Sequence, residues 1–248
     1  RIAGALSGMV LAIVLTTYLG VSQFGEIAQA LSLTMVLSLF CTIGLEAACP
    51  KFLIGNLQQS AFGQARSFVY FSFCVFILMS IFICFMAFFV FSGQSKLITF
   101  AILSAPVVAL TRMGAGLAMG FSNVYGAIIP RSFLRPFLFL CITVLGVMQL
   151  SPLPAHWIMI GFIIANMAVF GVQIIVLLRP LRKLEIDAYG QPLSFVQWRT
   201  WLEFGGIVGS AVIFIEFFQH ISILIASYTL SMAEIGYLDI SLKLVGFI

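Results

Sequence analysis

Long stretches without a charged residue dominate this sequence. No Asp, Glu, Lys or Arg occurs between Arg66 and Lys96, between Glu26 and Glu46, or from Pro136 to Leu178. A helix of about 20 apolar residues crosses the roughly 30 Å hydrocarbon layer of a membrane. Only 8% of the 248 residues are charged, whereas soluble domains carry about 25%. The sequence therefore predicts an all-α, polytopic transmembrane helix bundle and not a soluble enzyme.

Charged and turn-forming residues divide the chain into eight expected helices. Ser151-Pro152-Leu153-Pro154, for example, separates two of them with a turn. The expected helices are 1–19, 26–49, 67–91, 97–121, 132–150, 156–178, 201–228 and 237–248. Arg1 is followed at once by span residues, and Ile248 ends inside an apolar helix. We therefore expect the chain to be a fragment of a longer protein.

The basic residues of the expected connections lie almost entirely on one side of the membrane. Alternate connections (50–66, 122–135 and 179–200) hold eight Lys and Arg, whereas the opposite ones hold only Lys96. The eight are Lys51, Arg66, Arg131, Arg135, Arg179, Arg182, Lys183 and Arg199. Because basic loops stay in the cytoplasm, the first helix is expected to start there.

The 179–200 stretch is the only substantial connection and suggests a domain boundary. We expect a cytoplasmic linker, with an interfacial helix anchored by Trp198 and Trp201. It would join a first six-helix lobe (1–178) to the start of a second lobe (201–248). A short repeat supports this boundary: LGVSQFG at 19–25 and LSMAEIG at 230–236 each precede an apolar helix, and repeated halves are common in transporters.

Several short motifs occur in order along the chain. They are Tyr18-Leu19-Gly20 through Phe24-Gly25, Gly44-Leu45-Glu46 with Lys51-Phe52, Pro130-Arg131 with Leu134-Arg135-Pro136, and Ile223-Leu224 through Ala233-Glu234-Ile235-Gly236-Tyr237 with Lys243. Together they resemble polysaccharide flippases of the multidrug/oligosaccharidyl-lipid/polysaccharide exporter superfamily. The resemblance implies twelve or more helices in two lobes around a central cavity. This chain would supply the first lobe and the first two helices of the second.

The same resemblance implies a function. Such a protein moves a lipid-linked oligosaccharide on polyprenyl pyrophosphate from the cytoplasmic to the outer leaflet of the bacterial cytoplasmic (inner) membrane by alternating access. The product would be a cell-surface polysaccharide such as O-antigen of lipopolysaccharide, capsule or exopolysaccharide. Partners would include membrane lipids and the polymerase and glycosyltransferases of the pathway, but not nucleic acid. No cofactor is expected, and transport would be coupled to protons, Na⁺ or the membrane potential.

Arg112 lies inside an expected helix, where a charge costs at least about 2.5–3.5 kcal/mol and usually faces a partner or water. Its guanidinium suits a pyrophosphate, which offers oxygens for bidentate hydrogen bonds. The alternatives are a structural ion pair with Glu46 or a side chain that reaches the interface. Pro106, six residues earlier, would kink the helix and leave backbone carbonyls free near Arg112.

Glu216, Gln219 and His220 form a second candidate site. Their i, i+3 and i+4 spacing places them on one helix face. A carboxylate and an imidazole there could couple transport to protons or bind a cation. The alternative is polar packing between helices through hydrogen bonds.

Two further charged sites are candidate parts of the substrate cavity. Asp239 and Lys243 are spaced i, i+4, so they form either an intrahelical pair or a cavity entrance with a free lysine. Glu46 lies about one turn from Pro50 and Lys51. That position favours a carboxylate directed to the cytoplasmic interface.

No catalytic residue and no metal ligand is predicted. The chain lacks Walker A, HExxH and GxSxG motifs, and its five Cys have no CxxC spacing. Two other function classes stay open. A multidrug or cation antiporter of the same superfamily would favour acidic residues such as Glu216, whereas Arg112 and Lys243 favour the flippase. A membrane-embedded glycosyltransferase or polymerase would need a large outer loop, and all expected outer loops are short.

Overall fold

Helices make up nearly all of the structure, a computed structural model that describes residues 2–91, 95–149 and 154–245. The helices are α1 (Ile2–Leu19), α2 (Val21–Thr42), α3 (Leu45–Gln58), α4 (Phe62–Val90), α5 (Lys96–Gly120), α6 (Val124–Ile129), the π-helix η1 (Pro130–Leu134), α7 (Arg135–Gln149), α8 (Ala155–Asp187), α9 (Trp198–Ala226) and α10 (Met232–Val245). No strand occurs among these residues. The prediction of an all-α bundle is confirmed.

Six helical stretches in the described part of the chain are long and apolar enough to cross a membrane. They are Val21–Gln58, Phe62–Val90, Lys96–Gly120, Val124–Gln149, Ala155–Asp187 and Trp198–Phe218. A shorter apolar stretch covers Ser7–Leu19. The exposed face of α4 carries large apolar side chains such as Leu78, Ile81 and Phe85, which suits contact with lipid rather than water. The chain is a multi-pass membrane protein.

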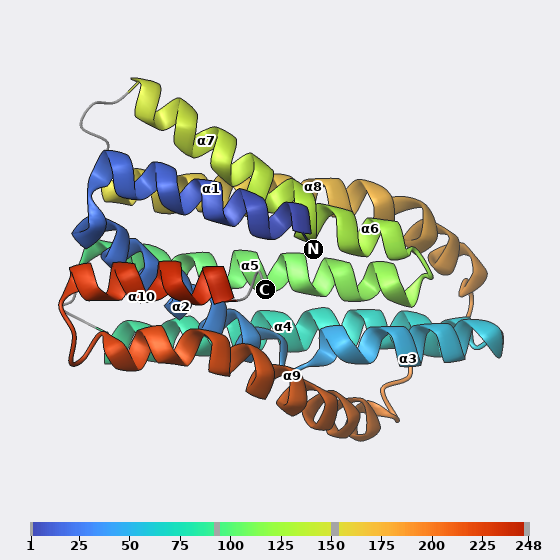
Figure 1. Ribbon diagram of the computed structural model, residues 1–248. Helices are drawn as coiled ribbons and strands as arrows, with labels where there is room; N and C mark the ends of the chain where they lie inside the picture. Colours follow the sequence, from blue (N-terminus) through green and yellow to red (C-terminus); the bar gives the residue numbers. More distant parts are fainter. Residues whose placement is uncertain (1, 92–94, 150–153, 246–248) are drawn as a thin grey trace.

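The helices lie side by side (Figure 1), and successive long stretches run in opposite directions, with α2 and α3 forming one such stretch and α6, η1 and α7 another. One end of the bundle gathers the C-terminal ends of α1, α4, α7 and α9, and the other gathers those of α3, α5 and α8. Helix α5 lies at the centre and contacts α2, α3 and α8. The alternation of connections on which the sequence-based orientation depends is therefore present.

The expected helix at 26–49 differs most from the structure. It begins earlier, at Val21, and continues to Gln58, but it is broken between α2 and α3. Ile43 and Gly44 at the break have positive φ angles of 48° and 72°. A left-handed conformation is costly for an isoleucine, so close packing around the break must impose it.

The expected linker is shorter and more ordered than the sequence suggests. Helix α8 continues through Asp187, because charged residues beyond the apolar stretch do not end a helix. The remaining segment is fixed to the start of α4. Gly63 N–H donates to Gln191 Oε1 at 2.6 Å, and Arg66 Nη2 donates to the Gln191 carbonyl at 2.5 Å. Ser194 N–H donates to Ser67 Oγ at 2.9 Å.

The prediction of an interfacial helix anchored by two tryptophans is wrong in part. No separate helix precedes α9, which begins at Trp198 itself. Trp198 is exposed, but Trp201 is fully buried. Its ring contacts those of Phe68 and Phe71, with centroids 5.4 and 5.3 Å away. The apolar partners on α4 take this indole out of the interface.

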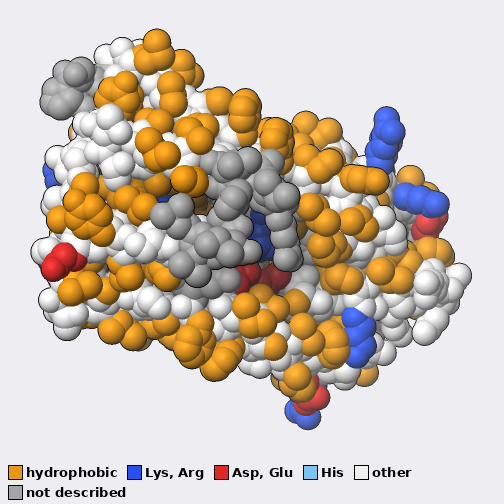
Figure 2. Space-filling model, viewed as in Figure 1, with side chains coloured by type: hydrophobic (Ala, Val, Ile, Leu, Met, Phe, Trp, Pro, Cys, Tyr) orange, Lys and Arg blue, Asp and Glu red, His pale blue; other side chains and the backbone are white. Residues whose placement is uncertain are grey.

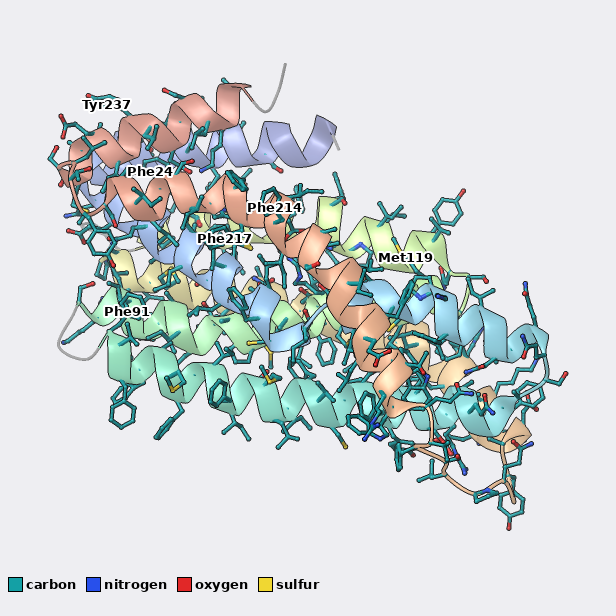
Figure 3. The ribbon with its side chains drawn as sticks, turned by 90° about the horizontal axis from the view of Figure 1, so that it is seen from below. Phe24, Phe91, Met119, Phe214, Phe217 and Tyr237 are labelled. Carbon is teal, nitrogen blue, oxygen red and sulfur yellow. The ribbon has the colours of Figure 1, made fainter. Side chains whose placement is uncertain are left out.

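Helices α9 and α10 pack directly on the first helices of the chain. Helix α10 contacts α1 and α2, and α9 contacts α2 and α3. The repeated segments meet here: a Cβ on Gly25 would overlap the Met232 carbonyl, and one on Gly236 would lie 2.6 Å from the Val21 carbonyl. Figure 3 shows Phe24 and Tyr237 at this same end of the bundle. The two similar sequences therefore form one glycine-lined contact.

The start of α10 supplies a testable pH effect. Ser231 N–H and Oγ both donate to Glu234 Oε2 at 2.8 Å, and these bonds lower the pKa of the exposed Glu234 carboxyl. The contact stabilises the fold at neutral pH, and its contribution is lost as the pH falls through the lowered pKa. We expect Ser231→Ala to raise the pKa of Glu234 in a carbon NMR titration. The control Ser241→Ala, on the same helix, should leave it unchanged; equal curves for wild type and Ser231→Ala would contradict the assignment.

Candidate functional site

Four charged side chains from four helical segments meet inside the bundle. Arg112 Nη1 lies 2.6 Å from Glu216 Oε2, and Arg112 Nε lies 3.3 Å from Glu46 Oε1. Arg131 Nη2 lies 3.3 Å from Glu216 Oε1. Their side chains are 2% (Arg112), 10% (Glu46), 27% (Glu216) and 35% (Arg131) exposed. We call these four residues the central ion cluster.

Glycines on α5 bring Glu46 to Arg112. Gly116 is one turn beyond Arg112, and a Cβ there would overlap the backbone carbonyl of Glu46. The absence of a side chain lets α3 lie directly against α5. Because the chain breaks at Gly44, Glu46 falls in the first turn of α3 and faces α5 at this close approach. An acidic residue is also favoured in the first turn by the helix dipole.

Glycines on α9 bring Glu216 to the same point. A Cβ on Gly44 would overlap the carbonyl of Gly205 and the Cα of Gly209. Glu216 is two turns beyond Gly209, on the helix that this contact holds close. The pattern Gly205-xxx-Gly209 therefore serves close helix packing, and through it the position of Glu216.

Arg131 comes from the π-helix η1, which begins at Pro130. The Arg135 N–H donates to the Pro130 carbonyl, five residues earlier. Single π-type turns inside α-helices are rare and occur frequently at functional sites. The wider turn places Arg131 against Glu216. Arg135, partly buried one turn later, interacts electrostatically with Arg131, Arg112 and Glu216 but has no ion pair among the described residues.

Arginines outnumber carboxylates in this region. Three guanidinium groups (Arg112, Arg131, Arg135) face two carboxylates (Glu46, Glu216). Arg112 is almost completely covered, whereas Arg131 remains partly open. Figure 2 shows basic and acidic side chains together near the centre of a face that otherwise carries its charges mainly at the ends of the bundle. The region can hold an anion at Arg131 and Arg135, while Arg112 is already neutralised.

The structure brings three of the predicted site residues, Arg112, Glu46 and Glu216, into one cluster. The sequence alone did not decide which of them pair. The ion pair of Arg112 with Glu46, considered as an alternative, is present. The prediction that Glu46 turns to the cytoplasmic interface is wrong, because Gly116 leaves room for α3 at α5 and Arg112 attracts the carboxylate. Glu216, predicted with His220 as a coupling site, forms ion pairs with both Arg112 and Arg131.

Of the other predicted residues, His220 interacts with this cluster. His220 is partly buried and interacts electrostatically with Glu216, Asp239, Arg112 and Arg135. The side chain of Gln219 lies outside the described residues. Lys243 Nζ and Asp239 Oδ2 are 2.5 Å apart, so the intrahelical pair is present. Lys243 also lines a hollow of about 70 Å³ between α1 and α10, together with Thr16.

The carbonyl freed by Pro106 is not near Arg112. Proline removes the bond to the residue four positions earlier, here Ile102, on the far side from Arg112. The Cys84 thiol approaches this carbonyl at 3.6 Å. Nearer to Arg112, Gln173 Nε2 donates to the Thr111 carbonyl at 3.0 Å. These contacts occupy the Ile102 and Thr111 carbonyls, so neither is a free acceptor near Arg112.

Arg131 and Arg135 are the residues of this region that the sequence-based predictions did not include in a candidate site. They were counted as loop charges, but both lie within the long apolar stretch Val124–Gln149. Their i, i+4 spacing next to Pro130 was the available signal, because it places two arginines on one helix face. Elsewhere in the described part of the chain, no group of three His, Cys, Asp or Glu residues could hold a metal ion.

Comparisons with known proteins add no further assignment. No family model, curated protein or solved structure matches the chain.

Proposed function

We propose that this chain belongs to a flippase that moves a lipid-linked oligosaccharide across the bacterial inner membrane, from the cytoplasmic to the outer leaflet. The main support is the surplus of arginine at the central ion cluster. Guanidinium groups bind phosphate oxygens in bidentate fashion, and Arg131 and Arg135 are the ones left available. The substrate would be a polyprenyl pyrophosphate glycan for a cell-surface polysaccharide, supplied by glycosyltransferases and consumed by a polymerase.

The proposed mechanism is an exchange of anions. The pyrophosphate replaces Glu216 at Arg131, and the released carboxylate, beside His220, takes up a proton or Na⁺. Alternating access then moves α9 and α10 relative to α2 and α3. Interrupted helices next to a buried site are typical of transporters, and both the break at Gly44 and the π-helix adjoin the cluster. The proposal assigns no catalytic residue to the chain.

The orientation follows from the basic end of the bundle. Arg179, Arg182 and Lys183 at the end of α8 and Arg199 at the start of α9 lie on one side. Basic segments stay in the cytoplasm, so the chain would start on the cytoplasmic side.

The decisive test uses the full-length protein in proteoliposomes with a fluorescent lipid-linked glycan. We expect the glycan to move between leaflets under a proton gradient, a Na⁺ gradient or a membrane potential. Efflux of cationic drugs without glycan movement would identify an antiporter instead. Elongation of the glycan would identify the polymerase class.

The double variant Arg131→Ala/Arg135→Ala should raise the KM for the glycan at least about tenfold. A hydrogen bond to a charged group is worth about 1.5–3 kcal/mol, and this variant removes two guanidinium groups that can donate such bonds. Glu216 keeps Arg112, so the fold is retained. Arg199→Ala, which removes an exposed cation stacked on Trp198, is the matched control and should leave the KM unchanged. An unaltered KM in the double variant would remove both arginines from the substrate site.

A further inference from the structure

A second site lies apart from the central ion cluster, in a cavity of about 590 Å³ at the end of the bundle where α2 and α5 begin and α9 ends. None of the four cluster residues lines it. Its walls come from α2, α5, α9 and the start of α10, together with Phe91 after α4. The volume is in the range of pockets that bury drug-sized ligands, about 300–1,000 Å³.

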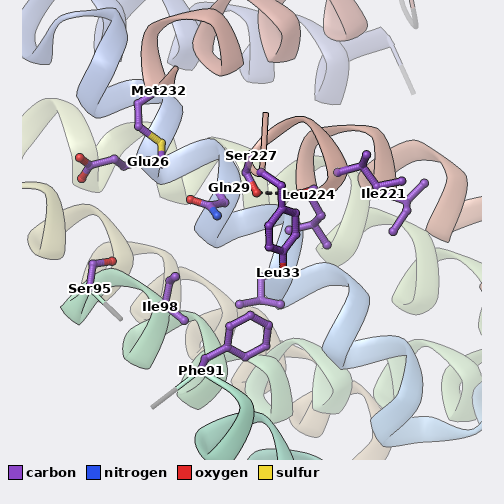
Figure 4. A pocket seen from close by; sticks show the side chains of 12 residues that line it. Glu26, Gln29, Leu33, Phe91, Ser95, Ile98, Ile221, Leu224, Ser227 and Met232 are labelled. Atoms are coloured by element: carbon purple, nitrogen blue, oxygen red, sulfur yellow. Dashed lines mark hydrogen bonds between the residues drawn. The ribbon is translucent and has the colours of Figure 1, made fainter. Parts of the chain in front are cut away.

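The cavity changes from polar to apolar along its length. Glu26, Gln29 and Leu33 line it from one face of α2, and Leu33 lies about 10 Å deeper than Glu26 at about 1.5 Å per residue. Ser95 and Ser227 accompany the polar end, and Ile221 lies deeper on α9. Figure 4 shows Glu26 at one end of the cavity and Ile221 at the other.

Among the described residues, Glu26 is the one charged side chain that lines the cavity. The described residues contain no hydrogen bond and no ion pair to its carboxylate. The amide of Gln29 is equally without a hydrogen bond among these residues. The carboxylate of the half-buried Glu26 lies beside apolar walls, and a cation with an apolar body would pair with the charge and cover these walls at once. Two aromatic rings, Phe91 and Tyr228, add faces that attract cations.

We propose that this cavity binds a lipophilic organic cation without a phosphate group. None of the described residues that line it is Lys or Arg, so the phosphate of a zwitterionic lipid would meet only the repulsion of Glu26. A neutral acyl chain would leave the carboxylate unpaired. The ligand would contact α2 on one side and α9 on the other, and would therefore stabilise the packing between them. The inference does not depend on the flippase proposal.

The test uses two probes of the same shape and opposite charge, tetraphenylphosphonium and tetraphenylborate. Binding to the purified protein in neutral detergent is measured by equilibrium dialysis, and a rise in Tm provides the second readout. We expect the phosphonium to bind, and Glu26→Gln to weaken it at least about tenfold, in line with a charge-assisted contact. Glu26→Asp should stay within a few-fold of wild type. The borate should not bind.

Two more variants test whether phosphonium binding depends on the charge of Glu26 and on the space inside the cavity. Glu203→Gln removes an exposed carboxylate of α9 that lies outside the cavity and should leave phosphonium binding unchanged. Ser95→Trp fills the exposed polar end and should abolish binding without touching Glu26. Equal affinity for the two probes, unchanged affinity in Glu26→Gln, or no phosphonium binding by the folded wild type would each overturn the proposal. Tm values without ligand establish that each variant is folded.

Discussion

Arg112→Met is expected to lower the free energy of unfolding by about 3–5 kcal/mol, the usual cost of removing one partner of a buried ion pair. Methionine has a similar length but no charge. Glu216 would keep Arg131, whereas Glu46 would keep no ion-pair partner among the described residues. The measurement is thermal unfolding in detergent, followed by tryptophan fluorescence.

Two comparisons make this prediction specific. Arg131→Met removes a partly exposed partner and should cost less than about 1 kcal/mol. The triple variant Glu46→Gln/Arg112→Met/Glu216→Gln removes all the charges that Arg112 joins, and should recover most of the lost stability. A small effect of Arg112→Met, within about 0.5 kcal/mol of wild type, would show that Arg112 does not hold the helices together.

Gly44→Ala should destabilise the protein by about 2–5 kcal/mol, through a strained backbone and a steric overlap. The φ angle of Gly44 is 72°, which an L residue adopts only at a cost. The new Cβ would also overlap the backbone of Gly205 and Gly209, so α9 has to move away from α3. Trp201, one turn before Gly205 and now fully buried, should become more accessible, with red-shifted emission and faster acrylamide quenching.

Gly55→Ala provides the matched control, because it lies in the same helix α3. Its φ is not positive, and nothing lies within 4 Å of the added Cβ. Alanine there should be neutral or stabilising by up to about 1 kcal/mol. If Gly44→Ala behaved like Gly55→Ala, the contact between the break and α9 would not be a determinant of the fold.

The sequence predicted the helices well because their signal is local. Charges cannot remain in hydrocarbon without partners, so their absence from 67–95 marks a helix regardless of what packs around it. The break at Ile43 could not be predicted in the same way. Isoleucine disfavours a left-handed conformation, and only the contact of Gly44 with α9, more than 160 positions later in the sequence, explains it.

The sequence predicted individual residues of the candidate site but not which of them form ion pairs. Arg112 and Glu216 stood out because each charge lies in an apolar stretch. Their partners depend on which helices touch, and that is decided by glycines such as Gly116 whose role is visible only in three dimensions. Arg131 was missed because its apolar surroundings begin at Val124, earlier than the sequence pattern suggested.

The break between α2 and α3 has a mechanical consequence. A continuous helix from Val21 to Gln58 would act as a stiff lever and transmit any tilt at one membrane surface to the other. The interruption at Gly44 works instead as a joint. The α3 arm is fastened to α5 through the Arg112–Glu46 pair, and the α2 arm is bonded to the same helix through Thr34, whose hydroxyl contacts the Ala101 carbonyl and Ser104 Oγ. Each arm therefore has its own attachment to α5, and a tilt of one arm is not carried to the other by an unbroken helix axis.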